Sequence, residues 1–240
     1  MRILKQVKKG VGVGALNTLA KGAVMGADEC IGQREVLLSA MGNDAPLAAL
    51  QGRNALGEAL RAAATAGLMA PLKALLGRSK EVAVDAKNWA GVTALMWAAA
   101  GGHAAAIAAL LEAGADVDAE TDDHMTALMF AAGGGAAAAV AALLAAGAEV
   151  NAKGKSGMTA LMCAANGGHP AAIAALLAAG AEVEATEETG MTALDIVKYN
   201  RNRMMTVASP ERHAAMRRCL ALLRAARRYR AFKRCLTVVC

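Results

Sequence analysis

The chain reads TALMWAAAGGHAAAIAALLEAGA at residues 93–115, and it repeats this pattern at residues 126–148 and 159–181. The second and third versions read TALMFAAGGGAAAAVAALLAAGA and TALMCAANGGHPAAIAALLAAGA, so each begins 33 residues after the one before. A fourth Thr-Ala-Leu begins at Thr192. Because several unrelated elements of the pattern keep one spacing, the middle of the chain is an array of short structural repeats.

Each repeat predicts two short helices joined by a tight turn. The first helix begins near Thr93, a good N-cap residue, and ends at Gly101-Gly102. The second helix places Ile107, Leu110 and Leu111 on one stripe. Helices this short are marginal in water on their own, so they must stack on neighbouring repeats.

The high alanine content could be mistaken for a membrane signal. Of 240 residues 63 are alanine, 56% are hydrophobic and only 2% are aromatic, and the mean hydropathy is +0.35. Stretches 89–111, 125–148 and 158–181 are long enough to span a bilayer, but glycine pairs divide each into two segments of about ten residues, below spanning length. We therefore predict no transmembrane segment, and we expect alanine to serve close helix packing.

Charge is distributed unevenly along the chain. The net charge of +6 divides into +5 for residues 1–87, −10 for residues 88–197 and +11 for residues 198–240. The acidic residues of the middle gather at 116–123 and 182–188, in the loops between repeats. These loops are either a solvated face or an acidic surface that attracts a basic partner or the protein's own tail.

The five cysteines are scattered and include no Cys-x-x-Cys pair. This pattern predicts neither a disulfide framework nor a zinc site, and it favours a reducing intracellular compartment, first of all the cytoplasm. The first 27 residues hold five basic residues and no acid. An organellar presequence is therefore the alternative.

Residues 88–120, NWAGVTALMWAAAGGHAAAIAALLEAGADVDAE, resemble the ankyrin repeat. By this resemblance the full repeats are 88–120, 121–153 and 154–186, with a degenerate capping repeat at 55–87 and a partial repeat at 187–208. The resemblance implies an all-α ankyrin-repeat solenoid of stacked helix-turn-helix units joined by hairpin loops. Residues 1–54 are a partly basic N-terminal extension, and residues 209–240 are a basic C-terminal helix and tail.

The chain departs from the family pattern at several positions. The proline after each threonine is alanine, and the histidine that follows is Met96, Met129 or Met162, so thioether packing must replace its hydrogen bonds. His124 replaces a turn glycine. His103 and His169 keep the family's structural histidine at the start of the second helix, whereas Ala136 loses it.

The family binds partners through its hairpin tips and the concave face of its inner helices. By resemblance the candidate contacts are Trp89, Val92, Asp122, Asp123, Met125, Lys155, Met158, Glu188 and Met191 at the tips, and Gly134 and Asn166 on the inner helices. We expect the small inner positions to make the concave face shallow. A bulky residue at Gly134 should then weaken partner binding without unfolding the array.

Ser209-Pro210-Glu211 is a good helix start. The helix that follows has one apolar stripe through Met216, Leu220 and Leu223 and a second from Cys219 to Tyr229 and Phe232. The basic candidates for an anionic partner are Arg217, Arg218, Arg224, Arg227, Arg228, Arg230, Lys233 and Arg234. The helix either caps the array with a solvated basic face, or it binds an acidic protein surface, nucleic acid, anionic lipid or a calmodulin-like partner.

The sequence predicts no catalytic residues, no metal site and no cofactor, because no nucleophile, ligand or phosphate-loop pattern has the required spacing. The predicted function is a non-catalytic protein–protein interaction module or adaptor. The alternative is a structural subunit of a larger assembly, organellar or ribonucleoprotein, anchored by its basic extensions.

Overall fold

The computed structural model describes residues 53–78, 82–204 and 209–239. Most of the predicted N-terminal extension and the tail end of the partial repeat lie outside these residues, as do the side chains of 53–55, 203–204 and 232–239. The helices are α5 (Arg53–Ala66), α6 (Met69–Leu76), α7 (Ala94–Gly101), α8 (Ala104–Glu112), α9 (Ala127–Gly134), α10 (Ala137–Ala145), α11 (Ala160–Gly167), α12 (Pro170–Ala178), α13 (Ala193–Met204) and α14 (Pro210–Val239).

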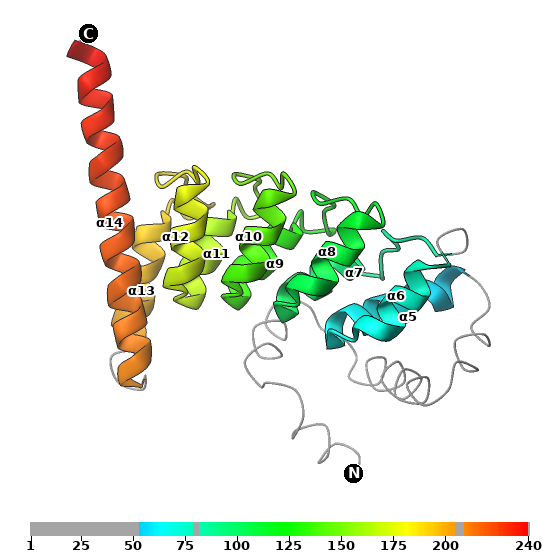
Figure 1. Cartoon of the computed structure of the whole chain (residues 1–240). Helices are drawn as coiled ribbons and strands as arrows, with labels where there is room; N and C mark the ends of the chain where they lie inside the picture. Colours follow the sequence, from blue (N-terminus) through cyan, green and yellow to red (C-terminus); the bar gives the residue numbers. More distant parts are fainter. Residues whose placement is uncertain (1–52, 79–81, 205–208, 240) are drawn as a thin grey trace.

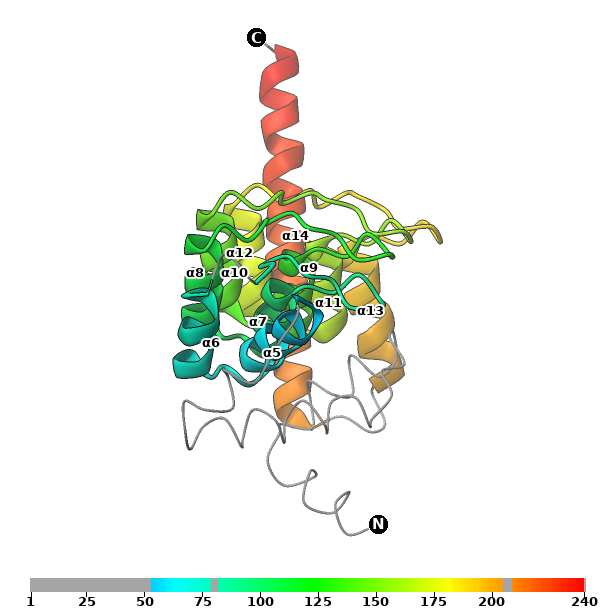
Figure 2. The ribbon, with the colours of Figure 1, turned by 90° about the vertical axis from the view of Figure 1, so that its right-hand side faces the viewer.

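The helices stack in two rows, which confirms the predicted all-helical solenoid (Figure 1). We call α5, α7, α9, α11 and α13 the inner row, because each packs against the next along the array. The outer row is α6, α8, α10 and α12. Figure 2 shows the loops between repeats running over both rows and projecting past the inner row.

The inner helices α7, α9 and α11 start and stop in the same way, as the repeat predicts. The hydroxyls of Thr93, Thr126 and Thr159 each accept a hydrogen bond of 3.4 Å from the backbone N–H three residues later. At the other end Gly102 has φ of +71°, a left-handed conformation that a residue with a β-carbon adopts only with strain. These signals confine each helix to about two turns.

Alanine fills the space between the rows. Ala98, Ala99, Ala131 and Ala132 have no exposed surface, and the large side chains that remain between them are mainly leucine. A methyl group lets neighbouring backbones approach closely at full packing density. Met96, Met129 and Met162 are each 1% exposed, so thioethers do take the family histidine's place in the core.

The fourth repeat uses a carboxylate where the others use methionine. Asp195 accepts a hydrogen bond of 2.7 Å from the Thr192 hydroxyl and receives a salt bridge of 2.9 Å from Lys198. The hydrogen bonds from Lys198 and Thr192 hold the pKa of Asp195 below its usual range. This carboxylate therefore caps α13 as an anion at its positive end.

The hairpin of the second repeat carries the only non-glycine residue of the described chain in a left-handed conformation. His124 has φ of +55°, where the equivalent Gly91, Gly157 and Gly190 have +74°, +75° and +80°. Its ring pairs with Glu120 at 2.6 Å, which offsets part of the strain.

Helix α14 stands across the end of the array and packs on α12 and α13. Its buried residues are Met216, Cys219, Leu220 and Leu223, so its first half covers the last repeat as a cap. Tyr229, which the sequence places on the second apolar stripe, does not join this packing, because its side chain is 67% exposed. By that point the array has ended and offers no further apolar surface.

Among the helices of the described residues, none is both long and apolar enough to cross a bilayer.

Two histidines tie neighbouring repeats together. His103 Nε2 donates to the carbonyl of Thr65 at 3.1 Å, and His169 Nε2 donates to that of Gly133 at 3.0 Å. Each ring lies over two glycines, one at the end of its own repeat's inner helix and one in the turn of the repeat before. A β-carbon at any of these glycines would collide with the ring.

The equivalent place in the second repeat keeps its glycines but lacks the ring. Ala136 is flanked by Gly134 and Gly102, and a β-carbon on Gly134 would lie 3.0 Å from the Ala100 carbonyl oxygen. We expect Ala136→His to donate to that oxygen and to raise the free energy of unfolding by about 1 kcal/mol. Urea denaturation measures the change. Ala138→His, at an exposed position of α10, is the control and should give no gain.

Acid should weaken the tie made by His169. Burial, and then the charge of Arg212, lower the pKa of His169 from its ordinary 6.5, against the raising effect of the Gly133 hydrogen bond. The unfolded chain therefore binds this proton at a higher pH than the folded chain does. The stability that His169 contributes above pH 6.5 is accordingly lost as the pH falls below that value. Denaturation midpoints between about pH 8 and about pH 5 should fall for the wild type and fall less for His169→Gln. Parallel profiles would contradict this.

Candidate functional site

The hairpin tips form one continuous edge. Backbone hydrogen bonds join successive tips, from Asp122 N–H to Ala90 O (3.5 Å), Lys155 N–H to Asp123 O (2.9 Å) and Glu188 N–H to Ser156 O (3.0 Å). The tips therefore hold a fixed spacing, and side chains on them present a single preorganised surface.

A second set of bonds fixes the loops nearer the outer row. Asp85 Oδ1 accepts from the N–H of Asp116 at 3.1 Å, Asp118 Oδ1 from that of Glu149 at 2.8 Å, and Asn151 Oδ1 from that of Glu182 at 2.8 Å. Asp85, Asp118 and Asn151 lie 33 residues apart. Some of the acidic loop residues are therefore structural, and the regular spacing was the signal that could have identified them.

The structure places most of the predicted tip residues at the surface. Trp89 is 57% exposed, and Asp122, Asp123, Lys155 and Glu188 are also exposed. Lys155 and Asp123 form a solvent-exposed pair at 3.8 Å. Met125, Met158 and Met191 are half-buried. Val92 is only 7% exposed, so it belongs to the packing of its hairpin and offers a partner almost no surface.

On the inner row Asn166 and Gly134 are exposed as predicted, but both also serve the contact between repeats. Asn200 donates to the side-chain oxygen of Asn166 at 3.0 Å and to its carbonyl at 3.2 Å. At Gly134 a β-carbon would lie 3.0 Å from the Ala100 carbonyl oxygen. A bulky residue at Gly134 would therefore also press on the backbone of the neighbouring repeat, so we expect it to cost some stability as well as partner binding.

Three aromatic side chains of the inner row were not predicted as candidates. Trp97 and Phe130 are half-buried at equivalent positions of α7 and α9, one turn before Ala100 and Gly133, which are also half-buried. Tyr199, at the equivalent of Asn166, is 57% exposed. Extending the 33-residue spacing to these positions would have identified them.

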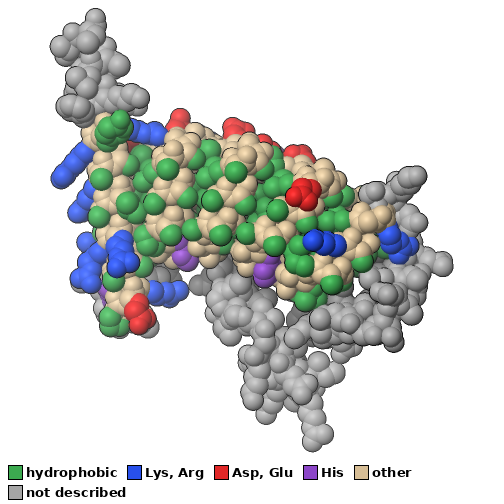
Figure 3. Space-filling model, viewed as in Figure 1, with side chains coloured by type: hydrophobic (Ala, Val, Ile, Leu, Met, Phe, Trp, Pro, Cys, Tyr) green, Lys and Arg blue, Asp and Glu red, His purple; other side chains and the backbone are tan. Residues whose placement is uncertain are grey.

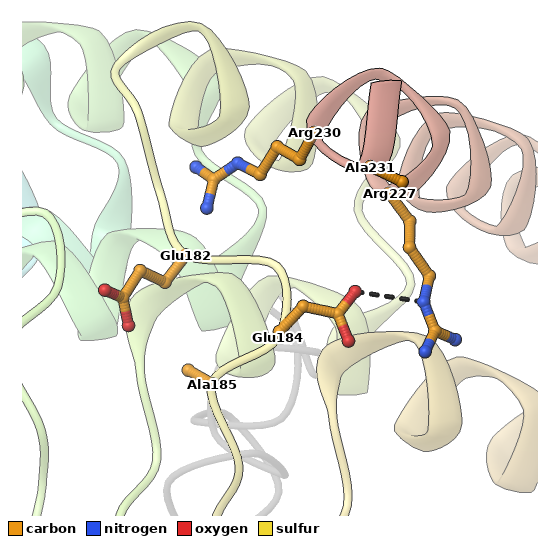
Figure 4. A pocket seen from close by; sticks show the side chains of 6 residues that line it. All are labelled: Glu182, Glu184, Ala185, Arg227, Arg230 and Ala231. Carbon is orange, nitrogen blue, oxygen red and sulfur yellow. Dashed lines mark ion pairs between the residues drawn. The ribbon is translucent and has the colours of Figure 1, made fainter. Parts of the chain in front are cut away.

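The candidate basic residues of α14 divide into two groups, and Figure 4 shows the first of them, Arg227 and Arg230. Arg227 Nε pairs with Glu184 at 3.0 Å, and the Arg230 guanidinium donates to the carbonyls of Gly180 (3.1 Å) and Ala181 (2.6 Å). With Glu182, these side chains line an open pocket of about 380 Å³ between the last loop and α14. Their charge is thus directed at the protein's own array.

The second group of arginines points to solvent. Arg217, Arg218, Arg224 and Arg228 are exposed, and no ion pair reaches them from the described residues. The side chains of Lys233 and Arg234 lie outside the described residues. Figure 3 shows Lys and Arg side chains gathered along α14 at the end of the array.

The two described thiols are poor nucleophiles. Burial raises the pKa of Cys163 to about 12 and that of Cys219 to about 11, so both stay protonated at neutral pH.

In the part of the chain that the structure describes, no three His, Cys, Asp or Glu side chains converge to hold a metal ion. At the last hairpin, hydrogen bonds from Thr189 lower the pKa of Glu187.

Comparison with known proteins agrees with this geometry. Two models that describe ankyrin repeats match the chain, one over residues 60–154 and the other over residues 143–197. No curated protein matches it.

Removing Arg230 should loosen the second half of α14. Arg230→Ala deletes both hydrogen bonds to the carbonyls that follow α12, whereas the first half of the helix remains held by Met216, Leu220 and Leu223. We expect faster amide deuterium exchange around residues 224–231 and unchanged exchange around residues 216–223. The exposed Arg228→Ala is the matched control. Equal exchange in both variants would show that Arg230 does not hold the helix.

Proposed function

The chain belongs to the ankyrin-repeat family, and from this we propose that it is a non-catalytic adaptor that binds a protein along its hairpin tips and the concave face of its inner row. Ankyrin repeats generally serve protein–protein interaction. The tips of this chain supply the rigid edge that such binding requires, because backbone bonds join them.

The observation that carries the proposal is how the repeats differ. Their buried positions are almost identical, with Thr, Ala, Leu and Met in the same order. The exposed tip position instead changes from Trp89 to Asp122, Lys155 and Glu188. Each repeat therefore offers different chemistry on one scaffold, as a surface that recognises a specific partner does. Trp89, a large exposed aromatic at one end, suits the role of an anchor.

The solvent-facing arginines of α14 support a second contact. We propose that Arg217, Arg218, Arg224 and Arg228 bind an anionic surface, first of all that of an acidic protein, with nucleic acid or anionic lipid as alternatives. Arginine suits this task because its planar fork binds carboxylates and phosphates with two hydrogen bonds. Binding of a polyanion should weaken steeply with salt.

The buried free thiols of Cys163 and Cys219 support a reducing compartment. We propose the cytoplasm as that compartment, with an organelle as the alternative suggested by the acid-free basic N-terminus.

Comparative affinity purification with mass spectrometry tests both contacts. A tip variant carries Trp89→Ser, Asp122→Ser and Glu188→Ser, and a helix variant carries Arg217→Ser, Arg224→Ser and Arg228→Ser. All six side chains are exposed, so both variants should fold. We expect the tip variant to lose array partners at least about tenfold while retaining partners of α14, and the helix variant to do the reverse. If the tip variant retains every partner of the wild type, the array is not the binding surface.

A further inference from the structure

The outer row exposes an almost uncharged surface. We call the solvent side of α6, α8, α10 and α12 the outer face. Over the residues of these four helices the only charged side chains are Lys73 and Glu112. Figure 3 shows this face mainly as hydrophobic side chains and backbone, with most of the acidic side chains along its upper edge and most of the Lys and Arg side chains along α14 at its left end.

The packing of the solenoid does not explain this composition. Close stacking accounts for the buried alanines, such as Ala106, Ala139 and Ala172. The exposed alanines of the outer face have no such role, and they are Ala70, Ala74, Ala105, Ala108, Ala138, Ala141, Ala145, Ala171, Ala174 and Ala178. Helix propensity does not explain them either, because Glu, Lys and Gln are nearly as favourable and keep a surface soluble.

The face also has a repeated shape. Leu111, Leu144 and Leu177 are half-buried at one position of three successive helices, so they form a leucine row across the face. Exposed alanines lie on the same helices beside this row. A row of larger side chains next to rows of methyl groups suits interdigitation with another helical surface.

We propose that the outer face pairs with the outer face of a second copy of this chain. Lys73 and Glu112 give the four helices of the face one charge of each sign, so the two helical surfaces that meet carry no net charge. A symmetric pairing also allows each charge to approach its opposite on the other copy. A strongly acidic or basic partner would find no complementary charge here. This contact is separate from the concave face of the proposed function.

The size of the face fits reversible association. Helices of eight or nine residues are about 13 Å long, and four of them at a spacing of roughly 10 Å cover about 500 Å² as a flat footprint. The accessible area of a corrugated helical surface exceeds its footprint, and it approaches the roughly 800 Å² per partner of standard interfaces. We therefore expect a dimer that dissociates on dilution.

Sedimentation velocity of the full chain from low to high micromolar concentration tests the proposal. The wild type should shift from monomer to dimer, and Ala141→Glu with Ala174→Glu should raise the dissociation constant at least about tenfold. The matched control is Ala221→Glu with Ala225→Glu, the same change at exposed positions of α14, and it should dimerise like the wild type. Circular dichroism checks that each variant is folded.

Deuterium exchange of the wild type at the two ends of this range gives a second measurement that depends on no variant. Exchange should slow in α8, α10 and α12 at high concentration and stay constant in the inner row. The proposal is overturned if the wild type is monomeric throughout, or if the outer-face variant associates as strongly as the control. A higher oligomer that persists in the outer-face variant would likewise assign association to another surface.

Discussion

The structure depends on the contact between one repeat and the next. A pair of two-turn helices buries too little apolar surface to fold alone, so each repeat is stable only against its neighbours. Alanine and glycine allow the inner helices to approach closely enough for His103 and His169 to reach a carbonyl of the preceding repeat. The same contact fixes the loops, because a side-chain oxygen on one loop accepts the N–H of the next. The straight hairpin edge is thus a product of the stacking.

An array held in this way needs an ending, because its last repeat has no neighbour. Helix α14 ends the array, because its side chains make contacts with the last repeat in place of those that a further repeat would make. Its apolar side chains cover the last core, and Arg227 binds Glu184 where the next repeat would lie. Arg230 binds carbonyls that follow α12. The acidic array and the basic C-terminal segment are thus two sides of one interface, although the exposed Arg217, Arg218, Arg224 and Arg228 remain for other contacts.

Much of this fold was predictable from the sequence, because the 33-residue spacing fixes the two rows, the threonine caps and the glycine stops. The acidic loops indicated that the array could attract the protein's own tail, but the sequence did not specify the partners of Arg227 and Arg230. Those pairings depend on where α14 crosses the array, which no local pattern specifies. For the same reason the sequence alone did not show that Val92 is buried or that Tyr229 is exposed. Both depend on whether another element of the fold packs against the residue, and a helical period in the sequence does not reveal this.

The contacts that hold α14 have a consequence for how such a chain changes length. Glu184 is the fourth member of the series Asp85, Asp118 and Asn151, and Gly180-Ala181 recurs as Gly114-Ala115 and Gly147-Ala148. The last repeat therefore offers the cap carbonyl groups that every full repeat possesses, and a polar side chain at a position where every repeat has one. Loss or duplication of one 33-residue unit would preserve the groups that α14 binds on the last repeat. It would change only the number of hairpin tips that a partner contacts. Repeat number and termination are thus separable in this architecture, so the reach of the binding edge can vary without a new way to end it.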